Sequence, residues 1–397
     1  MAGKTVFALA AISWAVPAFH YAEVAALRTN APLQAAKLAA EDAKVLGHVL
    51  GTRFDSNPGF KPGAKGVSDI RTALVAQPLE PKLLGAMGLA YEAQGDTKQA
   101  TKVMRVAYRA SRHDSVSGLY LIENASASGD VKATLKHYNT VLSTQPDLNA
   151  ALLPILSSAI AYPEIRTAVR PYLQSNAKWV STFLTVAAEK SSVNDLQALL
   201  LPLPKALLSE EYAPILASVL YRMAVEGGRN GALRFASAAI PGLSPATLTN
   251  LTADPATLDK RLGGFAWTFP PHDGIQVQVG EDKSLQINAD PLRRGTVAVR
   301  DFLLEAGGKY NLVQRLDFGS GSGRINARWS AECITSTGIE PFWEQRLPIS
   351  SVRGRYRSEL AVPQGCKVVR LALFVEGPDG QIPATLALSG LLLSKAN

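Results

Sequence analysis

Residues 81–114 read PKLLGAMGLAYEAQGDTKQATKVMRVAYRASRHD, and this stretch decides the fold of the N-terminal part of the chain. Its Gly95-Asp96 pair recurs 34 residues later as Gly129-Asp130. A fixed period of this length in an Ala- and Leu-rich sequence is typical of stacked helical hairpins, none of which can bury its apolar face alone. Because such stacks bind partners along a surface and seldom carry out chemistry, the period predicts a binding role.

Each period is expected to contain two helices with a tight turn between them. The residues expected to face inward are Leu84, Met87 and Tyr91 in the first helix and Ala100, Met104 and Ala107 in the second. In the turn, Gly95 can adopt the left-handed conformation that ends a helix, and Asp96 can cap the start of the next one. Small residues at Gly88 and Ala100 would let the two helices approach closely.

This arrangement resembles the tetratricopeptide repeat (TPR). The matching residues are Leu84, Met87-Gly88 and Tyr91 in the first helix and Ala100, Met104 and Ala107 in the second. The sequence departs from the family at Met87, where the family has Leu, and at Arg112, where it has a closing Pro. The next unit, residues 115–148, is more degenerate and has Ile122 at the small position. The resemblance covers residues 69–148, and the alternative is an irregular helical bundle.

The resemblance to TPR proteins implies a concave groove that binds a protein partner. Helices 82–93 and 116–127 would line this groove, with Glu92 and Asn124 as contacts. Less regular helices are expected at 32–51 before the repeats and at 150–161, 164–174, 179–190, 193–202, 212–226 and 231–240 after them. We therefore assign residues 29–240 to a TPR-like helical repeat domain. Residues 241–264 are rich in Pro, Ser, Thr and Asn, which predicts a linker.

The hydrophobic period changes from helical to two-fold after residue 264, which predicts β-strands. They are expected at 275–279, 284–287, 296–302, 309–318, 324–333, 355–362, 367–376 and 384–393. Short strands separated by Gly, Pro and Asp turns indicate an antiparallel β-sandwich over residues 265–397. Residues 306–310 and 362–366, each leading into an alternating strand, resemble the jelly roll of carbohydrate-binding modules. The expected fold class is α+β multidomain, a TPR-like α-helical solenoid followed by a jelly-roll-like β-sandwich.

Cys333 and Cys366 are the only cysteines in the chain. Two cysteines cannot supply the four ligands of a structural zinc site. In an exported domain they could form a disulfide, which would stabilise the fold by roughly 3–4 kcal/mol in the chain-entropy model. The alternative is a pair of unbonded cysteines in the core.

Residues 1–28 are interpreted as a signal anchor or a signal peptide. Lys4 precedes an apolar run, and Val16-Pro17-Ala18 offers a site for signal peptidase. If the helix continues to Leu27, it spans roughly 23 residues, and about 20 are enough to cross a bilayer. A buried helix of a cytosolic domain is the third interpretation. We favour an uncleaved anchor with periplasmic domains, and the alternative is secretion to the periplasm after cleavage.

Trp343 is the aromatic residue expected to be available for a sugar ring. It is flanked by Pro341 and Glu344, which predicts a loop in which its ring could stack on a glycan. The alternative is packing in the core of the sandwich, where aromatic residues contribute large buried areas. We expect that role for Trp329, which lies on an alternating strand close to Cys333.

Arg353, Arg355 and Arg357 are a second candidate site for a glycan. Alternation along a strand places all three side chains on one face and Tyr356 on the other. A row of guanidinium groups suits the carboxylate or sulfate groups of an acidic polysaccharide. The alternative is an ordinary solvated strand face.

No catalytic, metal-binding or cofactor-binding group of residues is expected. None of the five histidines, His20, His48, His113, His137 and His272, has a metal-ligand spacing to another candidate ligand. The Gly-Ser-Gly-Ser-Gly stretch at 319–323 fits neither a phosphate loop nor a nucleophile elbow. The net charge of +8 is spread thinly along the chain, which argues against nucleic-acid binding.

We therefore expect a non-enzymatic scaffold protein of the cell envelope with a role in polysaccharide assembly or export. The helical repeats would bind a protein partner, the sandwich a polysaccharide or a second protein, and the N-terminal helix the membrane. Two alternatives stay open. One is a glycan-active enzyme with an unrecognised carboxylate site in the sandwich, and the other is a purely structural sandwich that caps the solenoid.

Overall fold

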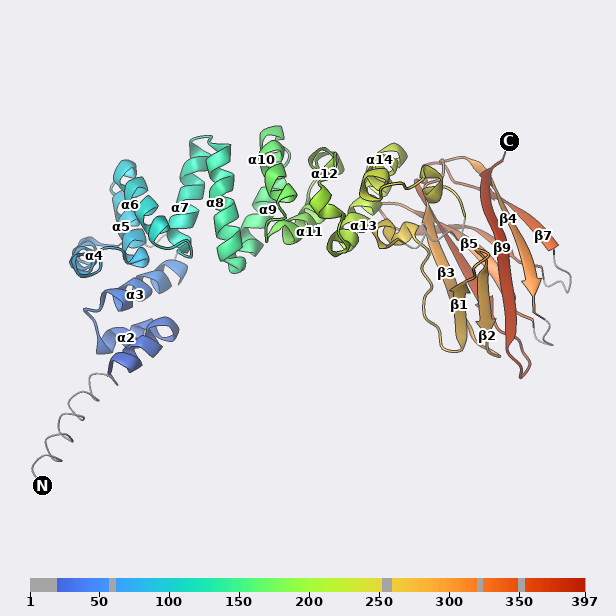
Figure 1. The fold of residues 1–397 in the computed structure, drawn as a ribbon, viewed down its shortest axis with the longest axis horizontal. Helices are drawn as coiled ribbons and strands as arrows, with labels where there is room; N and C mark the ends of the chain where they lie inside the picture. Colours follow the sequence, from blue (N-terminus) through green and yellow to red (C-terminus); the bar gives the residue numbers. More distant parts are fainter. Residues whose placement is uncertain (1–19, 57–61, 252–258, 320–323, 349–353, 397) are drawn as a thin grey trace, which may run out of the picture. The chain divides into compact units, whose positions relative to one another are not determined.

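The computed structural model describes residues 20–56, 62–251, 259–319, 324–348 and 354–396. The chain forms two compact units, Met1–Leu152 with Ala177–Trp179 and Leu153–Asn176 with Val180–Asn397. Helices occupy the N-terminal part of the sequence, and antiparallel strands follow them (Figure 1). The expected fold class, helical hairpins followed by an antiparallel β-sandwich, is confirmed.

The first unit begins with helices that precede the repeats. They are α2 (Pro32–Leu38), α3 (Ala43–Ser56) and α4 (Ala64–Ala76). The expectation of one helix over 32–51 was wrong, because the chain turns before residue 43. The carboxylate of Asp42 accepts hydrogen bonds from the backbone N–H groups of Lys44 and Val45, at 2.8 and 3.0 Å. It therefore caps a new helix start at this point.

Two helical hairpins follow, and their turns have the predicted chemistry. The helices are α5 (Pro81–Ala93), α6 (Thr97–Ala110), α7 (Ser115–Ala127) and α8 (Val131–Thr144). Gly95 and Gly129 both have positive φ, at 78° and 72°. The Asp96 and Asp130 side chains accept hydrogen bonds from the N–H groups three residues ahead. Each Gly-Asp pair thus ends one helix and caps the next.

Close contact between the helices of each hairpin depends on a glycine. A Cβ atom added to Gly88 would lie 2.7 Å from Cε of Met104, which is fully buried. A Cβ atom added to Gly118 would lie 2.7 Å from Cγ2 of Val141. The expected role of Gly88 is therefore confirmed, while membership of the TPR family stays a prediction.

The second unit begins with helices that lie close to the expected ranges. They are α9 (Asn149–Ala159), which starts in the first unit, then α10 (Pro163–Gln174), α11 (Val180–Lys190), α12 (Val193–Leu200), α13 (Ala213–Arg222) and α14 (Arg229–Ala239). Each has buried apolar side chains on one side, as a stacked amphipathic helix requires.

The sandwich of the second unit consists of two antiparallel sheets. Its strands are β1 (Ile275–Val279), β2 (Leu285–Ala289), β3 (Arg294–Phe302), β4 (Lys309–Phe318), β5 (Asn326–Ile334), β6 (Ile339–Arg346), β7 (Gly354–Ala361), β8 (Val368–Glu376) and β9 (Ala384–Lys395). The five-stranded sheet has the order β1-β2-β9-β4-β7, and the four-stranded sheet has the order β3-β8-β5-β6. The chain crosses repeatedly between the sheets, as in a jelly roll.

Every second side chain of the strands enters a core between the sheets. Trp329 is fully buried there, as expected, and its indole N–H donates to Oε1 of Gln314 at 2.9 Å. Such a bond is what a buried indole needs, because its N–H has left water. Alternation then fixes which side chains face outward on each sheet.

Strand β6 was not predicted, and Pro341 is the reason. Proline cannot donate to a sheet, so a sequence that contains it is easily taken for a loop. Here β6 is the edge strand of its sheet, and the register with β5 shifts between Ala331 and Glu332, opposite Pro341. Edge strands and bulges are the places where a sheet tolerates proline. Trp343 therefore lies on a strand, and its expected loop position was wrong.

The segment expected to be a linker is packed into the second unit over its described residues. Leu248 and Leu251 are fully buried, and Leu251 belongs to the sandwich core. The 3₁₀ segment η7 (Lys260–Phe265) packs against α13: a Cβ atom on Gly263 would lie 2.9 Å from Cβ of Ala217. These contacts tie α13 to the sandwich within this unit.

Arg300 of β3 is fully buried and anchors this segment. Its guanidinium group donates hydrogen bonds to the backbone carbonyls of Phe265, at 2.8 Å, and of Thr247 and Asn250. The guanidinium carbon also lies 5.0 Å from the ring centre of Phe302. Burial lowers the pKa of Arg300 to about 9, so the group still carries its charge at neutral pH.

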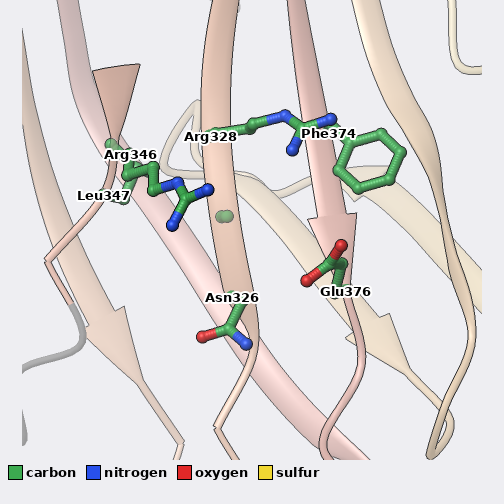
Figure 2. A pocket seen from close by; sticks show the side chains of 7 residues that line it. Asn326, Arg328, Arg346, Leu347, Phe374 and Glu376 are labelled. Atoms are coloured by element: carbon green, nitrogen blue, oxygen red, sulfur yellow. The ribbon is translucent and has the colours of Figure 1, made fainter. Parts of the chain in front are cut away.

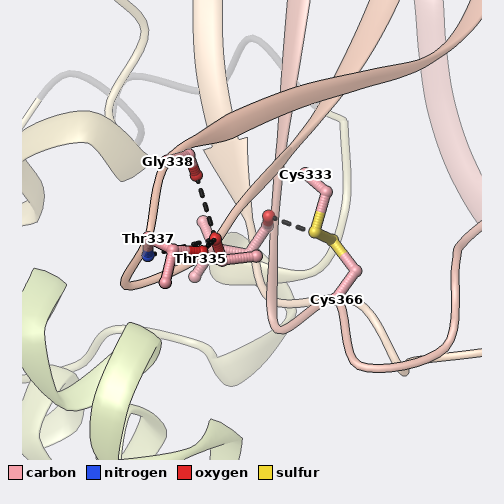
Figure 3. The surroundings of a disulfide bond; sticks show 6 residues. Cys333, Thr335, Thr337, Gly338 and Cys366 are labelled. Carbon is pink, nitrogen blue, oxygen red and sulfur yellow. Dashed lines mark hydrogen bonds between the residues drawn. A yellow bond between two sulfur atoms is a disulfide. The ribbon is translucent and has the colours of Figure 1, made fainter.

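Cys333 and Cys366 form a disulfide bond, which decides between the two interpretations of the sequence. Their Cα atoms lie 5.6 Å apart, within the usual range for a disulfide. The bond joins the end of β5 to the residues before β8, beside the turn that holds Thr335 and Gly338 (Figure 3). Since β5 and β8 are neighbours in their sheet, the bond fastens two strands that already pair.

The expected signal anchor falls mostly on residues 1–19, which lie outside the described part of the chain. Residues 20–30 are helical, and Val24 packs against Ala35 and Val45. Within the described residues, no helix has the length and apolar character needed to cross a bilayer. The anchor and the periplasmic location stay predictions.

Removal of the disulfide by the double substitution Cys333→Ala and Cys366→Ala is expected to destabilise the sandwich. The bond closes a loop between positions 33 residues apart. The chain-entropy model then gives a loss of about 3–4 kcal/mol in the free energy of unfolding. Urea unfolding followed by tryptophan fluorescence measures it. A reducing agent should destabilise the parent and leave the variant unchanged, and equal midpoints for parent and variant would contradict this expectation.

Candidate functional site

The outer face of the five-stranded sheet is rich in side-chain amides. The first four strands in the order of this sheet are β1, β2, β9 and β4. Their outward-facing side chains include Gln276 and Gln278 on β1, Gln286 and Asn288 on β2, Thr385 on β9 and Asp317 on β4. Their neighbours in sequence face the core, so the outward set is fixed by burial of the inward one.

These residues line a groove of about 790 Å³, which we call the amide groove. The strand register builds it from cross-strand neighbours: Gln278 lies opposite Gln286, and Asn288 lies opposite Thr385. Nε2 of Gln278 donates to Oε1 of Gln286 at 3.2 Å. The volume lies within the usual range of ligand sites, about 300–1,000 Å³.

The chemistry of the amide groove suits a neutral, hydroxyl-rich ligand. Each Gln or Asn side chain offers two N–H donors and one carbonyl acceptor, and a sugar hydroxyl can pair with either. Among the residues that line the groove, Asp317 is the one charged side chain. A ligand would therefore be held mainly by neutral hydrogen bonds.

Beyond the amide groove, the outer face of the same sheet carries arginine side chains on β4 and β7. Arg355 on β7 lies directly opposite Arg315 on β4, and both side chains are exposed. Arg357 faces the same way, and its Nε donates to Oδ1 of Asn311 at 2.8 Å. We call Arg315, Arg355 and Arg357 the arginine row. Like charges directly opposite one another in a sheet are destabilising, so this pair does not serve the stability of the fold.

The predicted arginines are placed as follows. Arg355 and Arg357 share the outer face of β7, and Tyr356 turns inward against the core, as alternation predicted. Arg353 lies outside the described residues. The sequence did not single out Arg315, because its pairing with Arg355 depends on the strand order and register.

Trp343 lies on the other sheet and does not reach the amide groove. Its side chain is half-buried against the core, and its indole N–H donates to the backbone carbonyl of Glu359 on β7 at 2.9 Å. The bond joins the edge strands β6 and β7 of the two sheets. A role for Trp343 in glycan binding stays a prediction.

Glu92 and Asn124 lie on α5 and α7 of the first unit. Glu92 is exposed, and its carboxylate accepts a hydrogen bond from the hydroxyl of Tyr120 at 2.8 Å. Burial raises the pKa of Tyr120, whose hydroxyl is protonated at neutral pH even without this shift. Asn124 is half-buried. Among the described residues, no hydrogen bond joins Glu92 to Asn124.

The amide groove was not predicted from the sequence, although part of its signal was visible. Residues 275–279 read IQVQV and residues 285–289 read LQINA, so amides alternate with apolar residues in both strands. Alternation identifies an outer face, but it does not show that β9 and β4 extend the same face. That step needs the strand order β1-β2-β9-β4.

In the part of the chain that the structure describes, no group of three or more His, Cys, Asp or Glu side chains is arranged to hold a metal ion.

The sequence matches no protein-family model and none of the curated proteins. Among solved structures it is similar to one described as "CBM4 structure and function", with 12% identity, a TM-score of 0.29, and coverage of 39% of this chain and 100% of that one. The CBM22-1 xylan-binding domain from Paenibacillus barcinonensis Xyn10C gives 12% identity, a TM-score of 0.26, and coverage of 37% and 93%. The enzymatically active domain of bacteriophage CBA120 tailspike protein 4 gives 12% identity and a TM-score of 0.27, and the match spans 34% of this chain but only 20% of that one. Similarity at this level carries no argument about the ligand of this chain.

Replacement of Arg355 by Glu is expected to raise the free energy of unfolding by about 0.5 kcal/mol, because it turns a like-charge pair with Arg315 into an attractive one. Chemical unfolding of the parent and the variant measures the change. The matched control is Arg357→Glu, which loses the bond to Asn311 and lies opposite Val313. An equal or larger gain for the control would show that the Arg315–Arg355 pair is not the cause.

Proposed function

We propose that the sandwich binds a polysaccharide chain through the amide groove. The observation that carries this proposal is the groove itself, about 790 Å³ in volume and lined by outward-facing Gln, Asn and Thr side chains. Hydroxyl groups of successive sugar units would pair with these amides across β1, β2 and β9. The arginine row lies on the same face and would contact acidic substituents of the chain, if the polysaccharide carries them.

The helical repeats supply the second part of the proposal, a scaffold role in the cell envelope. The first unit would bind a protein partner through the surface of α5 and α7 that carries Glu92 and Asn124. Stacked helical hairpins present such surfaces in many proteins, which supports a binding role and not a catalytic one. The chain would then hold a protein and a polysaccharide together in polysaccharide assembly or export, attached to the membrane by its N-terminal segment.

Truncation of the groove amides is expected to weaken polysaccharide binding. Gln286→Ala and Asn288→Ala each remove side-chain hydrogen bonds that would contact sugar hydroxyls, and a loss of about 1–1.5 kcal/mol lowers affinity about tenfold. The full chain is first applied to a glycan array, and the affinities for the best ligand are then measured by calorimetry.

The control for this experiment is Gln364→Ala, which removes an exposed amide from the turn between β7 and β8. It should bind like the parent. If no glycan binds the full chain, the proposal fails and a purely structural sandwich is favoured. If a glycan binds but the groove variants bind it as well as the control does, the amide groove is not its site.

The double variant Glu92→Lys, Asn124→Lys is expected to reduce capture of a protein partner at least tenfold, because two new cations on the surface of α5 and α7 would disturb a complementary interface. Partners are recovered by cross-linking in membranes, and their capture is quantified with each variant. The control is Glu164→Lys, a charge change at an exposed position of α10. Equal capture by all three chains would move the partner site away from Glu92 and Asn124.

A further inference from the structure

The outer face of the four-stranded sheet contains a pocket that the proposed function does not use. It has a volume of about 210 Å³ and is lined by Asn326, Arg328, Arg346, Leu347, Phe374 and Glu376 (Figure 2). These residues come from β5, β6 and β8 and from the residue after β6. At the other end of this face, Asp301 and Arg370 form an ion pair at 2.8 Å, and Asp301 is completely buried. The pocket therefore lies at the opposite end of this face from the buried Asp301.

Two arginines on neighbouring strands line this pocket. Arg328 on β5 lies directly opposite Arg346 on β6 in the antiparallel register. Arg328 has compensating contacts, since it lies 3.5 Å from a carboxylate oxygen of Glu344 and its guanidinium carbon lies 4.3 Å from the ring centre of Phe374. Arg346 is exposed and forms no ion pair with any described residue. Like charges directly opposite one another are unfavourable, and an anion between the two groups would offset their repulsion.

The other residues that line the pocket include a carboxylate and apolar side chains, which a site for a simple anion would not need. Glu376 on β8 lies directly opposite Asn326 on β5. Figure 2 shows the Glu376 carboxylate and the Asn326 amide below the two guanidinium groups, around the same space. A carboxylate accepts hydrogen bonds from hydroxyl groups, and an amide can accept or donate. Leu347 and Phe374 add apolar surface that can contact C–H groups. The pocket therefore combines groups that bind an anion with groups that bind neighbouring hydroxyls.

We propose that this pocket binds a single hexuronate unit, that is, a sugar ring that carries a carboxylate. The carboxylate would lie between Arg328 and Arg346, where a planar guanidinium group can form two parallel hydrogen bonds to it. The ring hydroxyls would pair with Glu376 and Asn326. The pocket is smaller than the usual range for drug-sized ligands, about 300–1,000 Å³, and this size suits one ring. It shares no residue with the amide groove, so the two proposals stand or fall separately.

The proposal is tested with short oligomers of glucuronate, galacturonate and mannuronate, each in the free and the methyl-esterified form. Binding to the full chain is measured by calorimetry in a background with Arg355→Gln and Arg357→Gln, which removes two of the three cations of the arginine row. At least one free oligomer is expected to bind, and its ester is expected not to. Arg346→Gln should weaken binding about tenfold or more, and Arg346→Lys, which keeps the charge but not the planar fork, should lie between parent and Gln variant.

The controls separate this site from general effects of substitution and from nonspecific attraction. Gln364→Ala, in the exposed turn between β7 and β8, should leave uronate binding unchanged, and Glu376→Gln should weaken it while increasing the local positive charge. Unfolding curves confirm that each variant folds. No binding of any free oligomer, or unchanged binding by Arg346→Gln, would overturn the proposal. Competition by acetate or by the free C-terminus of a short peptide at the same concentration as the oligomer would overturn its sugar component, since the pocket would then recognise a carboxylate alone.

Discussion

Burial of every second side chain between the two sheets is the constraint on which both candidate surfaces depend. Because the side-chain period of a strand is two, a slip of one residue would exchange the core set for the outer set. The buried set around Trp329 and Leu373 therefore also fixes where Arg328 and Phe374 point. The Cys333–Cys366 bond holds β5 and β8 at one end and supports the register from which the Arg328–Arg346 pocket is built.

Elements with strong local signals could be predicted from the sequence. The Gly-Asp pairs specified both hairpin turns, since glycine supplies the positive φ and aspartate supplies the cap. Alternation located β1 and β4 with their observed bounds. Strand β6 could not be predicted, because a strand accepts Pro341 only at an edge or a bulge of a sheet. Which strand lies at an edge is known only from the assembled sheet. The amide groove and the pairing of Arg315 with Arg355 could not be predicted from the sequence either, because both depend on which strands are neighbours in the sheet.

The two sheets carry the same kind of local conflict on their outer faces. Arg315 lies opposite Arg355 on one sheet, and Arg328 lies opposite Arg346 on the other. A sequence selected for stability alone would place opposite charges or neutral side chains at such positions. Natural proteins accept local conflicts mainly where function requires them. The ion pair of the buried Asp301 with Arg370 is by contrast matched in charge.

Arg300 limits where the chain could be cut to give a separate sandwich that can be joined to other proteins. Its guanidinium group is satisfied by carbonyls of Thr247, Asn250 and Phe265, all of which precede the first strand. A fragment cut at the first strand would leave this buried cation without those acceptors and would also lack Leu251 of the core. The strands of the sandwich are therefore not expected to form a stable domain without the residues that precede them. A separate sandwich, whether it arises by recombination or by design, must therefore include the chain from Thr247 onward, which lies before the first strand.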